Sequence, residues 1–177
     1  MPRIIELLPY DPRWPDQYQH EANHIAEIFS DQLVAIHHIG STAIPGIKAK
    51  PVIDIMVIVR EIEMVEQFNQ GMINLGYTPR GEHGIPGRRY FRKGSDDLHS
   101  HHVHVYGLGH QDITLQLNFR DYLRAHPMEA QAYSQLKEAL AQQYREDPAG
   151  YTDGKTDFVV ERNQRAAQWR KRQQQLG

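Results

Sequence analysis

The sequence of 177 residues contains no cysteine and carries little net charge, with a formal value of -2 at pH 7. The absence of cysteine excludes disulfides and thiolate metal sites, so any metal ion needs oxygen or imidazole ligands. The near-neutral charge gives no overall basic field, which argues against tight binding to nucleic acid. A small anionic ligand is still compatible with this composition, because it needs only a local basic patch.

Long apolar runs are also missing. No segment approaches the ~18 apolar residues that a membrane span requires, and the first residues show no signal-peptide pattern. Hydrophobic residues make up 40% of the chain and charged residues 24%, as in an ordinary globular domain. We expect a single domain over residues 1–177, no membrane partner and a cytoplasmic location.

Apolar residues at helical spacing predict two helices in the N-terminal half of the chain. The first follows Asp11 and Pro12, which are typical start signals, and extends to Phe29. The second covers residues 65–75 and ends at Gly76.

Three strands are predicted from apolar runs and alternation. "LVAIHHI" reads as a strand that ends at Gly40, and "PVIDIMVIVR" is apolar enough to be a central strand covered on both faces. "GRRYFRKGSDDLHSHHVHVYG" alternates polar and apolar residues around a Gly-Ser-Asp-Asp turn, which predicts a hairpin. His102, His104 and Tyr106 then share one face.

The C-terminal part of the chain is predicted to be helical. A helix over "ITLQLNFRDYLR" ends before Pro127, although "ITLQLNF" alone also fits a strand. A second helix stops near "EDPAGYTDGK", a turn-forming stretch, and a third carries Phe158 and Trp169. We expect these helices, over about residues 125–170, to pack on the core, and the tail "WRKRQQQ" to be a solvated helix end rather than a nucleic-acid patch.

A glycine-serine turn followed by a carboxylate in an apolar strand is the most informative pattern. At Gly40 and Ser41 the turn offers backbone N–H groups and a hydroxyl that can surround a phosphate, although most such pairs are simple turns. Asp54 must be paired, hydrogen-bonded or metal-bound, because burying an unpaired carboxylate costs several kcal/mol. A structural ion pair with Lys50 or Arg89 is the alternative, and the combined pattern favours a functional site.

Histidines offer further ligands. If the strand "LHSHHVHVY" lies beside the Asp54 strand, His102 and His104 point to the same side as Asp54. One carboxylate and two imidazoles are a donor set typical of manganese, zinc or iron. The alternative is a polar sheet face with one histidine hydrogen-bonded in the core.

Four segments carry a resemblance to a known family. "HHIGSTAIPGIKAKPVIDIMVIV", "FRDYLRAHP", "YSQLKEAL" and "YTDGKTDFV" closely resemble the GrpB family, over about Pro9 to Ala167. The resemblance implies the fold of the nucleotidyltransferase superfamily: an α+β domain with a mixed β-sheet flanked by helices and a C-terminal helical extension. No reaction is firmly assigned to the family, and a related domain fused to dephospho-CoA kinase in some chains is described as a protein-folding accessory.

The superfamily signature is a Gly-Ser or Gly-Gly turn, about a dozen residues, and two acidic residues separated by one. Three residues match it, namely Gly40, Ser41 and Asp54. The second acidic position falls on Met56, whose thioether cannot hold magnesium. In nucleotidyl transfer the paired carboxylates hold the metals that bridge the triphosphate, so the usual two-metal site is incomplete. His102 and His104 are then the best substitute ligands.

The resemblance and the residues together predict a set of site residues. Asp54 and Ser41 are the catalytic candidates, and Asp54 with His102 or His104 is expected to hold a divalent metal ion, either magnesium or manganese, or zinc. The residues expected to contact phosphates or nucleotide are Gly40, Ser41, Thr42, Lys50, Arg89, Arg120, Arg124, Lys137 and Lys155. The other residues expected in the cleft are His38, which the resemblance places just before the turn, Asp121 and Tyr151.

Each of these predictions has a structural alternative. The segment "FRDYLR" fits an interhelical salt-bridge network that docks the C-terminal helices, in which Asp121 pairs with one of them. Lys137, Tyr151 and Lys155 can reach the cleft or simply pack.

Three functions remain open. The first is binding of a nucleotide or another phosphorylated small molecule with a divalent metal, with nucleotidyl transfer as the reaction if one occurs. The second is a catalytically degenerate binding or folding-accessory module with a protein partner in coenzyme A biosynthesis, which Met56 supports and the fusion suggests by analogy. The third is a metal-dependent hydrolase built on the histidine face.

Overall fold

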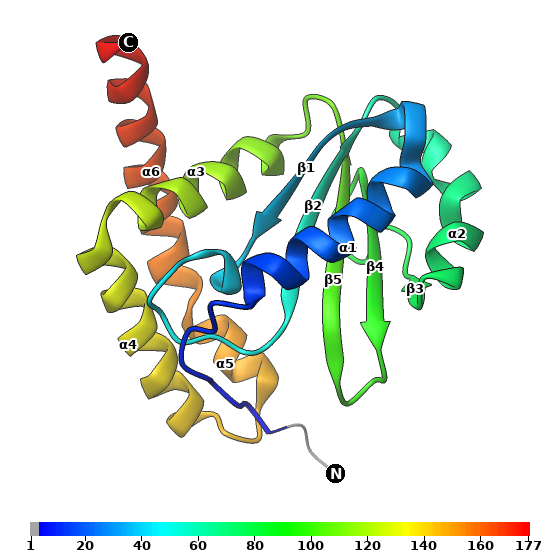
Figure 1. Ribbon diagram of the computed structural model, residues 1–177. Coiled ribbons are helices and arrows are strands. Elements are labelled where there is room, and N and C mark those ends of the chain that lie inside the picture. Colours follow the sequence, from blue (N-terminus) through cyan, green and yellow to red (C-terminus); the bar gives the residue numbers. More distant parts are fainter. Residues whose placement is uncertain (1–3) are drawn as a thin grey trace.

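A mixed sheet of five strands, with helices on both faces, is the centre of the computed structural model, which describes residues 4–177 (Figure 1). The elements in chain order are α1 (Trp14–Phe29), η1 (Ser30–Gln32), β1 (Leu33–Ile39), η2 (Ser41–Ala43), β2 (Ile53–Val59), η3 (Ile62–Phe68), α2 (Asn69–Asn74), β3 (Tyr77–Pro79), β4 (Arg88–Gly94), β5 (His99–Gly107), α3 (Gln111–Ala125), α4 (Pro127–Gln143), α5 (Pro148–Gly154) and α6 (Thr156–Leu176).

The strand order is β1-β2-β5-β4-β3. Only β2 and β5 pair in parallel, and the other neighbours are antiparallel. The register sets Asp54 of β2 opposite Ile39 of β1 and opposite His102 of β5. The α+β fold with a mixed sheet is therefore confirmed, with the apolar strand β2 at an interior position as predicted.

The two faces of the sheet have different partners. Helix α1 crosses one face and covers an apolar core that includes Ile55, Val57 and Val103. On the other face Met56 packs with Tyr106 and with side chains of α3. Because side chains alternate along a strand, Asp54 lies on the same face as Met56, at the end where β1 turns toward η2.

Helices α3 to α6 gather at the side of the sheet where β1 lies (Figure 1). A second core joins Ile44 and Ile47, from the connection between β1 and β2, to Tyr133 of α4 and Ala166 of α6. This packing brings the helices over the end of β2 that carries Asp54. Within the described part of the chain no helix is both long and apolar enough to cross a membrane.

Several local predictions need correction. The segment "EDPAGYTDGK", predicted as a turn, contains the short helix α5, because the Asp147 side chain accepts a hydrogen bond from the Gly150 N–H and Pro148 fits the first turn. The segment predicted as one helix over residues 65–75 begins in the 3₁₀ helix η3 and continues from Asn69 as α2. The helix predicted over "ITLQLNFRDYLR" is confirmed as part of α3, and the strand alternative for "ITLQLNF" is wrong.

Candidate functional site

The Gly40 turn lies directly against Asp54. Gly40 has φ 75° and ψ -173°, a backbone conformation that other residues rarely adopt. A Cβ atom at this position would lie 2.6 Å from Oδ2 of Asp54. Glycine is therefore needed both for the turn and for the close approach of the backbone to the carboxylate.

Two histidines of β5 hold the Asp54 carboxylate. Oδ1 of Asp54 lies 3.3 Å from Nε2 of His104 and 3.5 Å from Nδ1 of His102, and the side chain is 26% exposed. Burial acts to raise the pKa of the Asp54 carboxyl, but the hydrogen bonds from both histidines outweigh it and hold that pKa below its ordinary value. Asp54 is therefore ionised at neutral pH.

The groups around Asp54 are arranged to donate hydrogen bonds to its carboxylate. Nη1 of Arg88, which can only donate, lies 3.3 Å from Nδ1 of His104, so a neutral His104 carries its proton on Nε2, toward Asp54. Nε2 of His102 faces the His99 ring at 3.0 Å. Among residues 4–177 no three side chains of the metal-binding types form a group that could hold an ion. These residues do not fit a metal site in this arrangement, and the expected metal ion stays a prediction.

A cavity of about 220 Å³, here called the lysine cavity, opens beside Asp54. Its lining residues come from the connection between β1 and β2, from the sheet, from α4 and α5, and from the residue after α5. They are Gly40, Ser41, Lys50, Val52, Asp54, His102, Tyr133, Lys137, Tyr151 and Lys155. The structure thus brings together most of the predicted phosphate-contacting residues, and Tyr151 with them. The ammonium groups of Lys50 and Lys155 lie 5.3 and 4.5 Å from the centre of the Tyr151 ring.

The lysine cavity has an excess of positive charge. Lys137 is 2% exposed and donates a hydrogen bond to the Lys48 carbonyl. Burial, and then the charges of Lys155 and Lys50, lower the pKa of Lys137 to about 7. Burial and Lys50 lower the pKa of Lys155 to about 8, against the opposing effect of Asp54. Neither Lys137 nor Lys155 forms an ion pair with a carboxylate of the described residues, so the cavity is suited to an anion.

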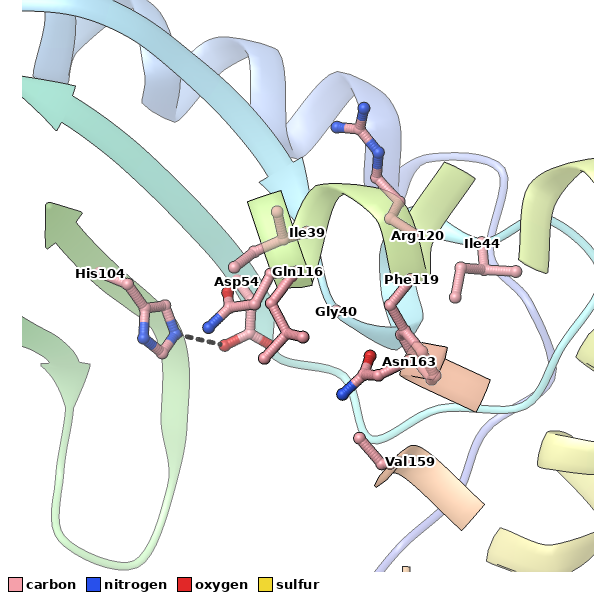
Figure 2. Close-up of a pocket in the computed structure, with 11 residues that line it drawn as sticks. Ile39, Gly40, Ile44, Asp54, His104, Gln116, Phe119, Arg120, Val159 and Asn163 are labelled. Atoms are coloured by element: carbon pink, nitrogen blue, oxygen red, sulfur yellow. Dashed lines mark hydrogen bonds and ion pairs between the residues drawn. The ribbon is translucent and has the colours of Figure 1, made fainter. Parts of the chain in front are cut away.

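A second cavity of about 320 Å³, here called the apolar cavity, lies on the other side of Gly40 and Asp54 (Figure 2). Figure 2 shows Asp54 and His104 on one side of it and Phe119, Val159 and Asn163 on the other. The residues that line it are Ile39, Gly40, Ile44, Asp54, His104, Leu115, Gln116, Phe119, Arg120, Val159 and Asn163. Gln116 and Asn163 were not predicted, because an amide on a half-buried helix carries no distinguishing signal in a single sequence.

The prediction that His38 faces the cleft is wrong. The register sets Ile39 opposite Asp54, so the preceding residue points to the opposite face. There the His38 ring stacks on Tyr18, with ring centres 4.8 Å apart, and its Nε2 lies 2.8 Å from the Thr42 hydroxyl. Thr42 is buried against this histidine and does not line either cavity, which corrects its expected contact with phosphate.

Two predicted arginines also lie outside both cavities. Arg89 is on the α1 face of the sheet, in an ion pair with Glu66. Arg124 donates from Nε to the Ala43 carbonyl at 2.8 Å. Neither side chain is placed to contact a phosphate beside Asp54, so these two predictions are corrected.

Arg120 and Asp121 form the interhelical network that was the structural alternative. Arg120 lines the apolar cavity, but in Figure 2 its guanidinium points away from Asp54, and its Nη1 donates to the His38 carbonyl at 3.1 Å. Its Nη2 also lies 2.8 Å from Oδ1 of Asp121, and the other oxygen of Asp121 pairs with Arg170 of α6. This carboxylate docks α6 on α3 and does not reach the lysine cavity.

Comparison with known proteins gives matches along nearly the whole chain. The family model described as "GrpB protein" matches residues 4–165. The chain is 44% identical over 169 residues to "UPF0157 protein YqkA" of Bacillus subtilis, covering 96% of this chain and 49% of that protein. It is 28% identical over 190 residues to a dephospho-CoA kinase of Mycobacterium bovis, covering 92% of this chain and 46% of the kinase. The chain thus spans about half the length of these two relatives.

Solved structures match the fold as well. The crystal structure of GrpB from Enterococcus faecalis superposes with a TM-score of 0.87 at 38% identity, covering 91% of this chain and 96% of that one. The Cid1 poly(U) polymerase superposes with a TM-score of 0.56 at 12% identity, covering 84% of this chain and 49% of the polymerase. The second match shows a nucleotidyltransferase-like fold and nothing more.

Proposed function

The chain belongs to the GrpB family, and from this premise we propose that it binds the phosphate groups of a nucleotide or of another phosphorylated small molecule in the lysine cavity. One observation carries the proposal. Lys137 and Lys155 line one cavity beside the Gly40–Ser41 turn without a carboxylate partner among residues 4–177. A phosphate group supplies the missing negative charge.

The binding energy has a clear physical origin. An anion between the ammonium groups offsets their mutual repulsion, and it moves the pKa values of Lys137 and Lys155 back toward that of an ordinary lysine. Hydroxyl groups add neutral hydrogen-bond donors, because burial raises the pKa of Tyr133 to about 12 and also raises that of Tyr151. Hydrogen bonds from these lysines and tyrosines to a phosphate are charge-assisted, and such bonds are about twice as strong as bonds between neutral groups.

Met56 favours binding over nucleotidyl transfer. The residue is fully buried in the sheet, at the position where the resemblance expects a second carboxylate. Among the described residues that line the two cavities, Asp54 is the single carboxylate, and the ligand is held by cations of the chain itself. A nucleotide that enters with a bound metal ion would instead depend on Asp54.

Isothermal titration with tripolyphosphate and with ATP, each in EDTA and in magnesium or manganese, tests the proposal. We expect binding in the micromolar range in EDTA. Lys137→Met and Lys155→Met should each weaken it at least tenfold, since a bond to a charged group contributes about 1.5–3 kcal/mol. Lys171→Met, at an exposed position of α6, is the matched control and should change nothing.

Asp54→Asn separates direct binding from metal-mediated binding. Direct binding predicts a severalfold tighter complex, because the variant removes a negative charge next to the phosphates. Metal-mediated binding predicts that the complex requires magnesium or manganese and is lost in the variant. If the wild type binds neither tripolyphosphate nor ATP under any of these conditions, the proposal is overturned.

The dephospho-CoA kinase relative supports a proposal about a partner. Most of this chain matches part of that kinase, and a partner is inferred by analogy with that chain. We therefore propose that the chain associates with an enzyme of coenzyme A biosynthesis. Sedimentation of this chain with a recombinant dephospho-CoA kinase from the same source should show a complex, and two independent species would contradict it.

A further inference from the structure

The apolar cavity adjoins the lysine cavity, because Gly40 and Asp54 line both. A ligand whose phosphates occupy the lysine cavity can therefore extend past the Gly40 turn into the apolar cavity. The volume of about 320 Å³ lies in the range of ligand pockets, which is about 300–1,000 Å³. The organic part of the ligand is thus the natural occupant of this second space.

The walls of the apolar cavity suit a flat ring. Ile39 and Ile44 contribute aliphatic surface, while Phe119 contributes an aromatic ring. Leu115 and Val159 extend the same surface from α3 and α6. Aromatic and aliphatic walls pack well against the faces of a planar heterocycle.

Two amides interrupt this apolar surface. Nε2 of Gln116 donates to the Tyr106 hydroxyl at 3.1 Å, which leaves the Gln116 carbonyl as an acceptor. The Asn163 side chain lines the cavity and makes no hydrogen bond with the described residues, so its donor and its acceptor are both available to a ligand. An alkyl chain would cover these amides and leave them unpaired, which is unfavourable. A heterocycle with hydrogen-bonding edges satisfies them.

We infer that the apolar cavity binds a nucleobase with an exocyclic amino group, read by Gln116 and Asn163, while the phosphates of the same nucleotide lie in the lysine cavity. This inference rests on the proposed function and names its substrate class. The amino group is specified because the fixed Gln116 carbonyl needs a donor, and an asparagine amide can pair with an adjacent amino group and ring nitrogen, as with adenine.

Three probes test the inference without metal, in EDTA: tripolyphosphate, ATP and ITP. ITP carries an oxo group where ATP has the amino group, and that oxygen would face the Gln116 carbonyl. ATP should bind at least tenfold more tightly than tripolyphosphate, and about tenfold more tightly than ITP.

Variants assign the effect to the two amides. Asn163→Leu and Gln116→Leu should bring ATP affinity close to that of tripolyphosphate and remove the preference over ITP. Gln164→Leu, exposed on the same helix as Asn163, is the matched control and should retain both. Unchanged tripolyphosphate affinity in the variants shows that they are folded.

The outcomes separate the two proposals. If tripolyphosphate binds but ATP gains nothing, or ATP and ITP bind equally, or the two amide variants keep the wild-type preference, the nucleobase inference is wrong and the phosphate site stands. If none of the three probes binds, the proposed function fails and the inference with it. A variant that also loses tripolyphosphate is replaced by Val159→Trp, which fills the cavity from α6 without removing an amide and should reduce ATP binding alone.

Discussion

Two lysine sites on opposite faces of the same sheet differ in one respect. On the α1 face, Nζ of Lys93 pairs with Oε1 of Glu21, and the Tyr77 hydroxyl donates to the same oxygen at 2.8 Å. In the lysine cavity, Lys137 and Lys155 have no such carboxylate among the described residues. Both sites are shielded from water, so burial alone does not distinguish the structural site at Lys93 from the proposed binding site in the lysine cavity. The two sites are distinguished by the carboxylate that pairs with Lys93 and that Lys137 and Lys155 lack among residues 4–177.

The comparison predicts that replacing a lysine lowers stability at the Lys93 site and raises it in the lysine cavity. The larger change is expected at Lys93, which is paired with a carboxylate. Lys93→Met leaves the buried Glu21 carboxylate without its ammonium partner. The free energy of unfolding at pH 7 should fall by on the order of 3 kcal/mol, as measured by urea denaturation. Tripolyphosphate affinity should not change, since Lys93 lies on the far face. A variant as stable as the wild type would remove the distinction between the two sites.

Lys137→Met should have the opposite sign and increase stability by about 1–2 kcal/mol near pH 6.5. The pKa of Lys137 is lowered from 10.5 to about 7, so the unfolded chain binds this proton more tightly than the folded chain does. The folded wild type is therefore penalised fully below pH 7, and the penalty disappears as pH rises toward 10.5. The loss of the hydrogen bond to Lys48 reduces the gain.

Denaturant unfolding of the wild type and Lys137→Met at pH 6.5 and pH 10 measures this effect. The difference should be present at pH 6.5 and largely absent at pH 10. Lys171→Met serves again as the control, because its position on α6 is exposed. A Lys137→Met variant less stable than the wild type at pH 6.5 would show that this lysine is a structural element.

The affinity for an anion should also depend on pH, because the same lysines lose their protons as pH rises. As pH rises from 6.5 to 9, Lys137 and Lys155, with pKa values of about 7 and about 8, lose their protons. Tripolyphosphate affinity should fall by about tenfold over this range, and binding at pH 8 should take up protons. Titrations in buffers of different ionisation enthalpy detect the uptake as a change in the observed heat. An affinity that is constant from pH 6.5 to 9 would contradict the assignment of these two lysines to the anion.

Much of the fold could be predicted from periodicity, because β2 is apolar throughout and α1 has a clear apolar face. The mixed topology could not be. The parallel pairing of Asp54 with His102 joins residues far apart in the chain, and the sequence offered the two strands as neighbours only as a condition. Local periodicity specifies an element, whereas its neighbours depend on contacts at long range.

The errors at the site have the same origin. A shift of one residue moves a strand side chain to the other face, and a sequence does not state the register. His38 was therefore chosen for the cleft although Ile39 is opposite Asp54, and Arg89 was chosen although Arg88 is on the Asp54 face. Lys50, Lys137 and Lys155 do line one cavity beside Asp54, and their contact with a phosphate stays a prediction. Asn163 was missed because its role depends on how α6 docks against α3.

Gly40, predicted from its turn and from the family signature, also lies against Asp54, and a pair of substitutions can isolate this second constraint. Gly40 and Gly46 have similar positive φ angles of 75° and 84°, so replacement by alanine costs each about 1–2 kcal/mol in backbone strain. Only Gly40→Ala also places a Cβ atom against Oδ2 of Asp54, whereas Gly46→Ala meets nothing within 4 Å. The Asp54 side chain is partly exposed and can move, so we expect Gly40→Ala to be about 1 kcal/mol less stable than Gly46→Ala.

The same pair separates the turn from the binding site. Since Gly40 and Asp54 line both cavities, Gly40→Ala should weaken ATP and tripolyphosphate binding severalfold, while Gly46→Ala should bind both as the wild type does. Urea denaturation and titration of the two variants measure the two differences. Equal stability and equal affinity in the pair would mean that the contact between the turn and the carboxylate has no energetic role. In that case the wall between the lysine cavity and the apolar cavity would owe its shape to Asp54 and its histidines alone.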